Sequence, residues 1–228
     1  MSNMVPKIVI RRLPLYLRTL ERIAQRQQRF VSSRELAKRL GFSSAQIRKD
    51  LSHFGEFGKQ GTGYNVAYLQ QQLSRILQVD QKWSMAIVGA GDLGHALINY
   101  AGFRDRNFDI KAVFDIDRNK IGRTIGQLQI EHVRHIPQRL KRLNIKIGII
   151  AVPARAGQQI AELLIEGGVR AILNYAPITL NIPPEINIEY IDPILALQSM
   201  TYYLERDAEQ VPEYRGEATL RQAQGTAS

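Results

Sequence analysis

Cysteine is absent from all 228 residues of the chain. Its absence excludes disulfides, thiolate metal sites, cysteine nucleophiles and thiol-based redox sensing. The sequence also lacks any apolar run near the ~20 residues that cross a bilayer, and no signal peptide is recognisable, so we expect a cytoplasmic protein. Hydrophobic residues make up 44% and charged residues 23% of the chain. These shares are ordinary for a globular protein and exclude wholesale disorder.

Acidic residues are scarce in the first third of the chain. Residues 1–80 hold 14 Lys/Arg against 5 Asp/Glu, a net charge of +9, whereas residues 81–228 hold 17 against 16, a net charge of +1. This asymmetry indicates a nucleic-acid or membrane partner for the first segment. A solvated basic surface would explain the charge equally well, so the choice between a binding partner and a solvated surface rests on the sequence motifs.

The basic third has the pattern of a helix-turn-helix. An apolar stripe predicts a first helix over residues 11–28. Ser32 and Glu35 have the spacing of a capping box at the start of a second helix, which Gly41 ends. A third helix follows, with Ile47 on its buried side.

The third helix carries the predicted DNA-reading residues. Its polar side chains suit the major groove, because Gln and Arg can make bidentate contacts to base edges while Ser and Lys bind phosphate. We therefore predict that this helix reads DNA, although a plain packing hairpin would show a similar pattern. The predicted contacts project outward from Ser44, Gln46, Arg48 and Lys49.

A glycine-rich piece at residues 58–64 follows the third helix. It fits a short β-hairpin, or wing, that lies on the phosphate backbone or enters a minor groove. The alternative is a flexible linker, but the alternating apolar residues after it favour a strand. The predicted DNA contacts of the wing are Lys59, Gly61, Gly63 and Tyr64.

The second part of the chain contains a GxGxxG motif between a short apolar strand, residues 85–88, and a helix. In this setting the first glycine makes the turn, the second lets a pyrophosphate approach the backbone, and the third lets the helix pack on the sheet. The motif predicts dinucleotide binding by Gly89, Ala90, Gly91, Asp92, Leu93 and Gly94.

An acidic residue at the end of the next strand supports this prediction. The strand at residues 108–114 runs into Asp115, whose carboxylate can accept hydrogen bonds from a ribose diol. A carboxylate there would also repel a 2′-phosphate, which favours NAD(H) over NADP(H). Arg118 and Lys120 lie close behind Asp115, so the preference is not absolute.

Further strands, at residues 145–152, 169–173 and 186–191, alternate with helices. This order predicts an α/β protein with a Rossmann-type, doubly wound parallel sheet, whose ligands bind at the carboxyl ends of the strands. The strand ends place Val152, Pro153, Asn174 and Tyr175 near the nicotinamide half of a dinucleotide.

These features predict four regions along the chain. A winged helix-turn-helix domain covers residues 1–80, and a Rossmann NAD(H)-binding domain covers 81–191. A C-terminal helix covers 192–209, and a polar, disordered tail covers 210–228. The helix has a broad apolar face that would pack on its own sheet or on a partner subunit.

The motifs together resemble the Rex family of redox-sensing transcriptional repressors. The segment 44–58 with 61–64 is similar to the family's winged-helix signature, and residues 89–94, 151–153 and 172–177 are similar to its nucleotide-domain motifs. The resemblance covers about residues 5–208. It implies a non-enzymatic homodimer that binds a palindromic operator when NADH is low and releases it when NADH binds, with NAD⁺ competing for the same site.

The resemblance also implies that the C-terminal helix is swapped between subunits. Arg18, Tyr100 and Asp192 are similar to the residues that couple the nicotinamide state to the angle between domains in this family, and Tyr100 would also contact the cofactor. Pro193 departs from the larger apolar residue that is usual after that aspartate in this family.

Two other classes of protein fit parts of the sequence. An NAD-dependent oxidoreductase with a basic appendage would need a substrate domain and a proton-transfer residue, and neither is apparent. We therefore expect no catalytic and no metal site. A regulator that binds CoA or another nucleotide also fits the glycine motif, although Asp115 argues modestly against it. Of the four histidines, His53 belongs to the DNA-binding part and His95 to the helix after the glycine motif. Only His132 and His135 could form a base or metal pair, and two exposed histidines are the commoner explanation of their spacing.

Overall fold

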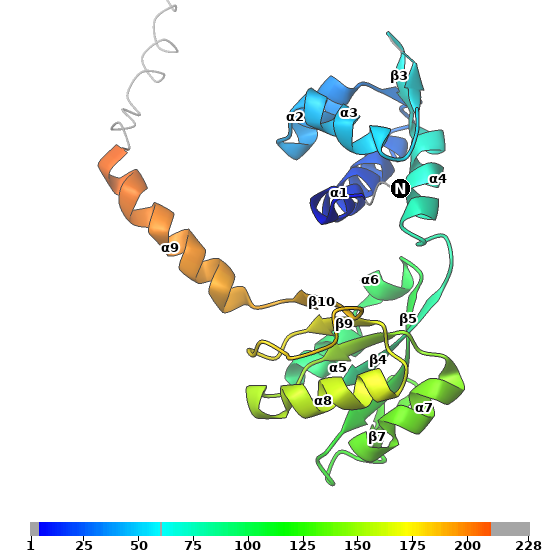
Figure 1. The fold of residues 1–228 in the computed structure, drawn as a ribbon, viewed down its shortest axis with the longest axis vertical. Helices are drawn as coiled ribbons and strands as arrows, with labels where there is room; N and C mark the ends of the chain where they lie inside the picture. The colour runs from blue at the N-terminus through cyan, green and yellow to red at the C-terminus, as the bar shows by residue number, and fades with distance from the viewer. Residues whose placement is uncertain (1–4, 60, 211–228) are drawn as a thin grey trace, which may run out of the picture. The chain divides into compact units, whose positions relative to one another are not determined.

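The computed structural model describes residues 5–59 and 61–210 (Figure 1). The predicted disordered tail therefore lies almost wholly outside the described residues. The chain forms two compact units. One contains the residues up to Met85 together with Asn99–Lys111, and the other contains Ala86–Ile98 and the chain from Ala112 onward.

The first helix, α1, spans Lys7–Ala24 rather than the predicted 11–28. It begins earlier because Pro6 takes the N-cap position, where its missing N–H costs nothing. It ends before Gln27, which has a left-handed φ of 59° that no α-helix continues through. Pro14 lies inside α1 without ending it.

The next two helices follow the predicted capping pattern. Helix α2 spans Ser33–Leu40, and the Ser32 hydroxyl accepts the backbone N–H of Glu35 at its start. Gly41 ends α2 with a φ of 72°. Helix α3 spans Ser44–Ser52 and is capped by the Ser43 hydroxyl, which accepts the backbone N–H of Gln46. The helix-turn-helix is thus built by local side-chain caps and one left-handed glycine.

A small three-stranded sheet completes the wing. Strand β3, Gly63–Asn65, pairs antiparallel with both β1, Phe30–Val31, and β2, Gly58–Lys59. The alternation of apolar residues favoured a strand end here, and β3 ends at Asn65. The Asn65 side chain caps helix α4, Val66–Ile76, by accepting the backbone N–H of Tyr68.

The first unit encloses its own hydrophobic core. Side chains of α1, α2, α3 and α4 meet there, and Phe54 and Phe57 pack against the cluster from the start of the wing. Ile47 is buried on α3 as predicted. The other buried members include Leu13, Leu20, Leu36, Leu51, Leu69 and Leu73.

The large sheet of the chain has seven strands in the order β10-β9-β8-β4-β5-β7-β6. Without the edge strand β6, which pairs antiparallel with β7, the order matches the dinucleotide-binding doubly wound fold. The strands in that order are Asn187–Tyr190, Ala171–Asn174, Ile147–Ile150, Trp83–Val88, Phe108–Asp115, Leu128–His132 and Thr124–Ile125.

Helices lie on both faces of this sheet. Helices α7, Ile136–Leu143, and α8, Ala154–Glu166, pack against each other on one face, and α5, Asp92–Ile98, lies on the other (Figure 1). The helix predicted after the glycine motif is confirmed as α5. Strands β6 and β7, helix α7 and the short turn Val133–His135 before it were not predicted.

Two further helices complete the described chain. Helix α6, Ala101–Arg104, belongs to the first unit. Helix α9 spans Pro193–Gln210, and its start is capped by the Asp192 carboxylate, which accepts the backbone N–H of Ile194 at 2.9 Å. Within residues 5–59 and 61–210, none of the helices combines the length and the apolar character that a membrane crossing requires.

Candidate nucleotide site and nucleic-acid interface

The glycine motif forms a tight turn at the carboxyl end of the central strand β4. The Gly89 N–H donates to the Phe114 carbonyl, and the Ala151 N–H donates to the Val88 carbonyl, each at 2.8 Å. Gly89 has a φ of +106°, and a Cβ added there would lie 2.2 Å from the Ala151 carbonyl oxygen. The turn therefore requires glycine at this position, both for its φ and for its space.

The other two glycines of the motif have opposite surroundings. A Cβ at Gly94 would lie 1.9 Å from the Gly89 carbonyl oxygen, so α5 packs directly on the turn. A Cβ at Gly91 would meet no described atom within 4 Å, so its backbone faces open space. This is the arrangement in which a pyrophosphate approaches the second glycine at the N-terminal end of the helix.

Asp115 joins the turn to the end of β5. Its Oδ2 accepts the Ala90 N–H at 2.8 Å, and its Oδ1 accepts the Asp117 N–H at 2.9 Å. Burial acts to raise the pKa of Asp115, but these hydrogen bonds and the Lys120 ammonium at 3.3 Å hold it below the ordinary value. The side chain is therefore an anion at neutral pH, as acceptance of ribose hydroxyls requires.

Exposed apolar side chains accompany these polar groups. Leu93 on α5 is 43% exposed, and Ile116, directly after Asp115, is 69% exposed. A flat base would find apolar surface at such side chains. Sequence reasoning did not single out Ile116, and its position immediately after the acidic residue of β5 was the available signal. Asp92 is exposed at the first position of α5, whereas Ala90 is buried in the turn.

The residues predicted near the nicotinamide divide into two kinds. Val152 lies against the glycine turn, since its Cγ1 would be 3.1 Å from a Cβ at Gly89, and Pro153 is the N-cap of α8. Asn174 instead braces its own loop. Its amide donates to the Ala176 and Ile178 carbonyls, and its Oδ1 accepts the Ala176 N–H.

Tyr175, and not Asn174, has the more accessible side chain of that loop. Asn174 is 1% exposed, whereas Tyr175 is half-buried, and burial raises the pKa of its phenol above the ordinary value. The phenol remains protonated over the physiological range and can donate a hydrogen bond.

The three residues of the predicted coupling set lie in different surroundings. Arg18 is exposed on α1. Tyr100 is 61% exposed before α6, and its ring meets Phe103 edge to face at 5.3 Å. Asp192 belongs to the other unit and caps α9.

On helix α3, which the sequence predicts to read DNA, the exposed side chains form one stripe. Arg48 and Lys49 lie on it as predicted, between Ala45 and Ser52, which sequence reasoning did not select. The spacing of three, four and seven residues puts all four on one face of the helix. The Arg48 guanidinium donates to the Ser33 hydroxyl at 3.0 Å, so it extends toward the start of α2.

Ser44 and Gln46 differ from the predicted outward orientation, since both are half-buried. The Gln46 side-chain amide donates to Asp50 Oδ1 at 2.7 Å. Asp50 is fully buried and also binds Arg12 and Tyr16 of α1. Sequence reasoning missed Asp50, although an acidic residue among the basic residues of this helix was a visible signal.

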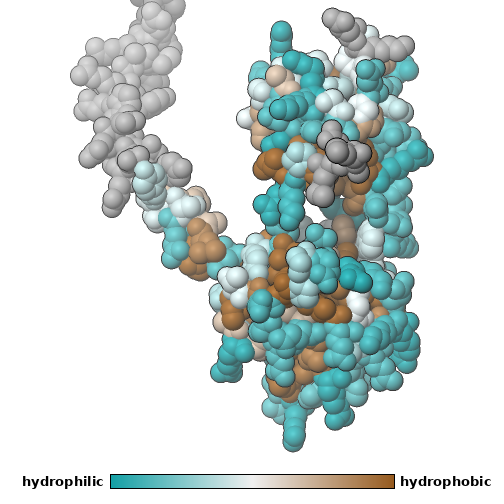
Figure 2. Space-filling view, viewed as in Figure 1, coloured by the Kyte–Doolittle hydropathy of each residue, from teal (hydrophilic) through white to brown (hydrophobic). Residues whose placement is uncertain are grey.

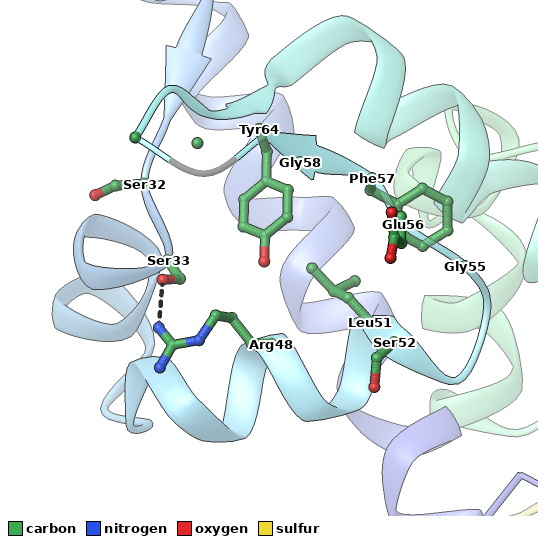
Figure 3. Close-up of a pocket in the computed structure, with 12 residues that line it drawn as sticks. Ser32, Ser33, Arg48, Leu51, Ser52, Gly55, Glu56, Phe57, Gly58 and Tyr64 are labelled. Atoms are coloured by element: carbon green, nitrogen blue, oxygen red, sulfur yellow. Dashed lines mark hydrogen bonds between the residues drawn. The ribbon is translucent and has the colours of Figure 1, made fainter.

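A groove of about 800 Å³ separates α3 from the wing (Figure 3). Arg48 and Ser33 stand on one side of it, the Tyr64 ring on another, and Leu51 and Phe57 supply apolar surface (Figure 3). Gly61 and Gly63 line the wing side, and the side chain of Lys59 lies outside the described residues. Hydroxyls, a guanidinium and glycine backbone are groups that contact nucleic-acid phosphates.

His132 and His135 both contact Arg134. His132 Nδ1 accepts the backbone N–H of Arg134, and His135 Nε2 lies 3.2 Å from the Arg134 Nε. In the part of the chain that the structure describes, His, Asp and Glu side chains form no group of three or more that would hold a metal ion.

Fold and site together define a class of protein: a winged helix-turn-helix DNA-binding module joined to a dinucleotide-binding doubly wound sheet. Two family models match the corresponding parts of the sequence. The model "Putative DNA-binding protein N-terminus" matches residues 4–52, and the model "CoA binding domain" matches residues 80–178.

The chain belongs to the Rex family of redox-sensing transcriptional repressors. It is 50% identical over 208 residues to the "Redox-sensing transcriptional repressor Rex" of Chloroflexus aurantiacus, covering 91% of this chain and 98% of that protein. The protein of the same name from Thermosipho africanus is 41% identical over 211 residues, covering 92% of this chain and 100% of that one. These relatives are repressors, so the chain is a regulator rather than an oxidoreductase.

Solved structures show the same relationship. A protein called RSP in complex with β-NAD⁺ and operator DNA matches with a TM-score of 0.86 and 36% identity, covering 91% of this chain and 96% of that one. RSP in complex with β-NADH matches with a TM-score of 0.82 and 35% identity, covering 91% and 98%. The fold class predicted from the sequence is thus confirmed.

Proposed function

We propose that this chain is a transcriptional repressor that holds operator DNA when NADH is low and releases it when NADH binds. The observation that carries the proposal is its similarity, over 91% of the chain, to a protein solved with β-NAD⁺ and operator DNA and also with β-NADH. Helix α3 and the wing would contact the DNA. The turn Gly89–Gly94 with Asp115 would hold NAD(H), whose site the open backbone at Gly91 fits.

The physical task of the repressor is to distinguish two forms of one ligand. NADH and NAD⁺ differ by a hydride and by one positive charge on the nicotinamide ring. A ligand shifts a conformational equilibrium only by its difference in affinity for the two states. Moving the equilibrium from 1:99 to 99:1 requires a preference of about 10⁴-fold. The pocket must therefore favour the neutral ring in the released arrangement.

We also propose that the chain acts as a homodimer on a palindromic operator. Two recognition helices about 34–36 Å apart, or a multiple of that distance, would enter successive major grooves. Helix α9 supports the dimer, because six of its large apolar side chains are 55–68% exposed, and Figure 2 shows apolar surface along it. In this dimer α9 would pack against the partner subunit. Arg18, Tyr100 and Asp192 would couple the nicotinamide state to the distance between the two recognition helices. The exposed side chains are Ile194, Leu195, Leu197, Met200, Tyr202 and Leu204.

The proposal is tested by operator release. A duplex selected from a random library by the protein without NADH is labelled, and binding is followed by fluorescence anisotropy at fixed salt, since affinity depends steeply on salt. We expect NADH to release the duplex and NAD⁺ to do so far more weakly. The double variant Arg48→Ala/Lys49→Ala is the control for DNA contact by α3, and it should bind the duplex more weakly than the wild type. Retention of the duplex at saturating NADH would refute the proposal.

Substitution of Asp115 should change the choice between the two nicotinamide dinucleotides. Asp115→Asn removes the charge that repels a 2′-phosphate and leaves Lys120, now 3.3 Å from Asp115, available to that phosphate. The ratio of NADH affinity to NADPH affinity should fall about tenfold, which corresponds to ~1.4 kcal/mol. Isothermal titration calorimetry with both ligands measures the ratio.

Asp109→Asn is the matched control for that measurement. Asp109 is the second residue of strand β5, whereas Asp115 is its last, and Asp109 pairs with Lys111 at 2.6 Å. The control should leave the affinity ratio unchanged. Equal ratios in the wild type and in Asp115→Asn would mean that this carboxylate does not face the ribose.

A further inference from the structure

A buried carboxylate links the recognition helix to α1. Asp50 Oδ2 accepts the Arg12 Nε at 2.6 Å and the Tyr16 hydroxyl at 2.5 Å. Its Oδ1 accepts the Arg12 Nη2 and the Gln46 Nε2, each at 2.7 Å. All four bonds converge on a side chain with no exposed surface. Both oxygens of Asp50 thus join α3 to α1 through Arg12, whereas Tyr16 binds only Oδ2 and Gln46 binds only Oδ1.

The charge of Asp50 determines which end of the Gln46 amide faces it. Burial alone would raise the pKa of Asp50, but the hydrogen bonds from Arg12, Tyr16 and Gln46 hold it below the ordinary value. An ionised carboxylate only accepts hydrogen bonds. The Gln46 amide must therefore turn its NH₂ group toward Asp50, because the reverse orientation would bring two acceptor oxygens together.

The position of Gln46 makes this orientation relevant to DNA. It is the third residue of α3, and the N-terminal residues of a recognition helix contact base edges. Its side chain is half-buried at the border of the exposed stripe that carries Arg48 and Lys49. With one N–H donated to Asp50, the amide keeps its Oε1 acceptor and one N–H for another partner.

We propose that Asp50 is a positioning residue that orients the Gln46 amide to read an adenine in the major groove. Adenine presents an N6 amine and the N7 acceptor, which match the Oε1 acceptor and the remaining N–H. Guanine and thymine present a carbonyl oxygen that would oppose Oε1, and cytosine has an amine but no N7. The inference rests on the proposed DNA-binding function and concerns the choice of base, not DNA binding as such.

The test measures base preference rather than overall affinity. Each base pair of the selected duplex is changed in turn to the other three, and the dissociation constants are measured without NADH at fixed salt. Wild type should prefer adenine at one position of each half-site by about tenfold or more. Gln46→Ala and Asp50→Asn should both lose that preference at that same position and keep the preferences elsewhere.

Tyr16→Phe is the matched control, because it removes a bond to Oδ2 while Gln46 is held by Oδ1. It should lower the thermal midpoint and leave the adenine preference intact. If Asp50→Asn weakens binding to all duplexes equally and keeps the preference, Asp50 is merely structural and the inference is wrong. If wild type binds no duplex at all, the proposed function fails instead.

A second measurement does not depend on the folding of the Asp50 variant. In the wild-type NMR spectrum, the side-chain amide of Gln46 is identified by its absence from the Gln46→Ala spectrum. One of its two protons should exchange slowly with solvent, unlike those of the exposed Gln71 on α4. Equal exchange rates for Gln46 and Gln71 would overturn the proposed orientation.

Discussion

Replacement of Gly91 with alanine should raise the NADH concentration needed for operator release about tenfold or more while the protein stays folded and bound to its operator. A Cβ at Gly91 would meet no described atom within 4 Å, so the thermal midpoint should change by only about 2–4 °C. The same methyl would occupy the space through which the pyrophosphate approaches the backbone, so NADH affinity should fall about tenfold or more. NADH fluorescence and operator anisotropy measure the two effects.

Gly94→Ala is the matched control for this expectation. Its Cβ would lie 1.9 Å from the Gly89 carbonyl oxygen, so α5 would have to move off the turn. We expect it to lose both NADH binding and about 1–3 kcal/mol of stability. The contrast separates a glycine needed by the fold from one needed by the ligand. Wild-type NADH affinity in Gly91→Ala would show that the pyrophosphate does not pass over this residue.

Replacement of Asp50 with leucine should lower the free energy of unfolding by about 3–5 kcal/mol, the usual cost of breaking a buried ion pair. The Arg12 guanidinium, whose side chain is 16% exposed, would lose its carboxylate partner, and the Tyr16 hydroxyl would lose its acceptor. Urea unfolding followed by circular dichroism measures the change. In the double variant Arg12→Met/Asp50→Leu, the loss should be smaller than the sum of the two single losses.

An exposed ion pair of the same unit provides the comparison. Glu35 and Arg39 pair at 2.8 Å on α2 with about a third of each side chain exposed, and Glu35→Gln should cost about 0–1 kcal/mol. Equal costs for Glu35→Gln and Asp50→Leu would show that burial does not strengthen the Asp50 network.

The contribution of Asp50 to stability should also depend on pH. Because its folded-state pKa lies below the ordinary 3.8, the stabilisation is present above that pH and is lost as the pH falls through the folded-state pKa.

Features of the fold that depend on neighbours in the chain were predictable from the sequence. The caps Ser32 and Ser43, the left-handed Gly41 and the glycine turn each act within a few residues, so their spacing identified the helix-turn-helix and the dinucleotide motif. The region between β5 and β8 was missed. Strands β6 and β7 are short, and helix α7 has only eight residues, so their periodic patterns are weak.

The sequence by itself determined the two-part plan of this protein, because charge asymmetry, capping residues and the order of strands and helices are local properties of the chain. Only the tertiary structure decided the roles of Asn174 and Asp50. Asn174 followed a strand end like a ligand-binding residue, but its amide braces its own loop. Asp50 joins α3 to α1 across 38 residues of chain. Hydrogen bonds between groups so far apart in sequence arise only when the helices pack, and no local pattern encodes them.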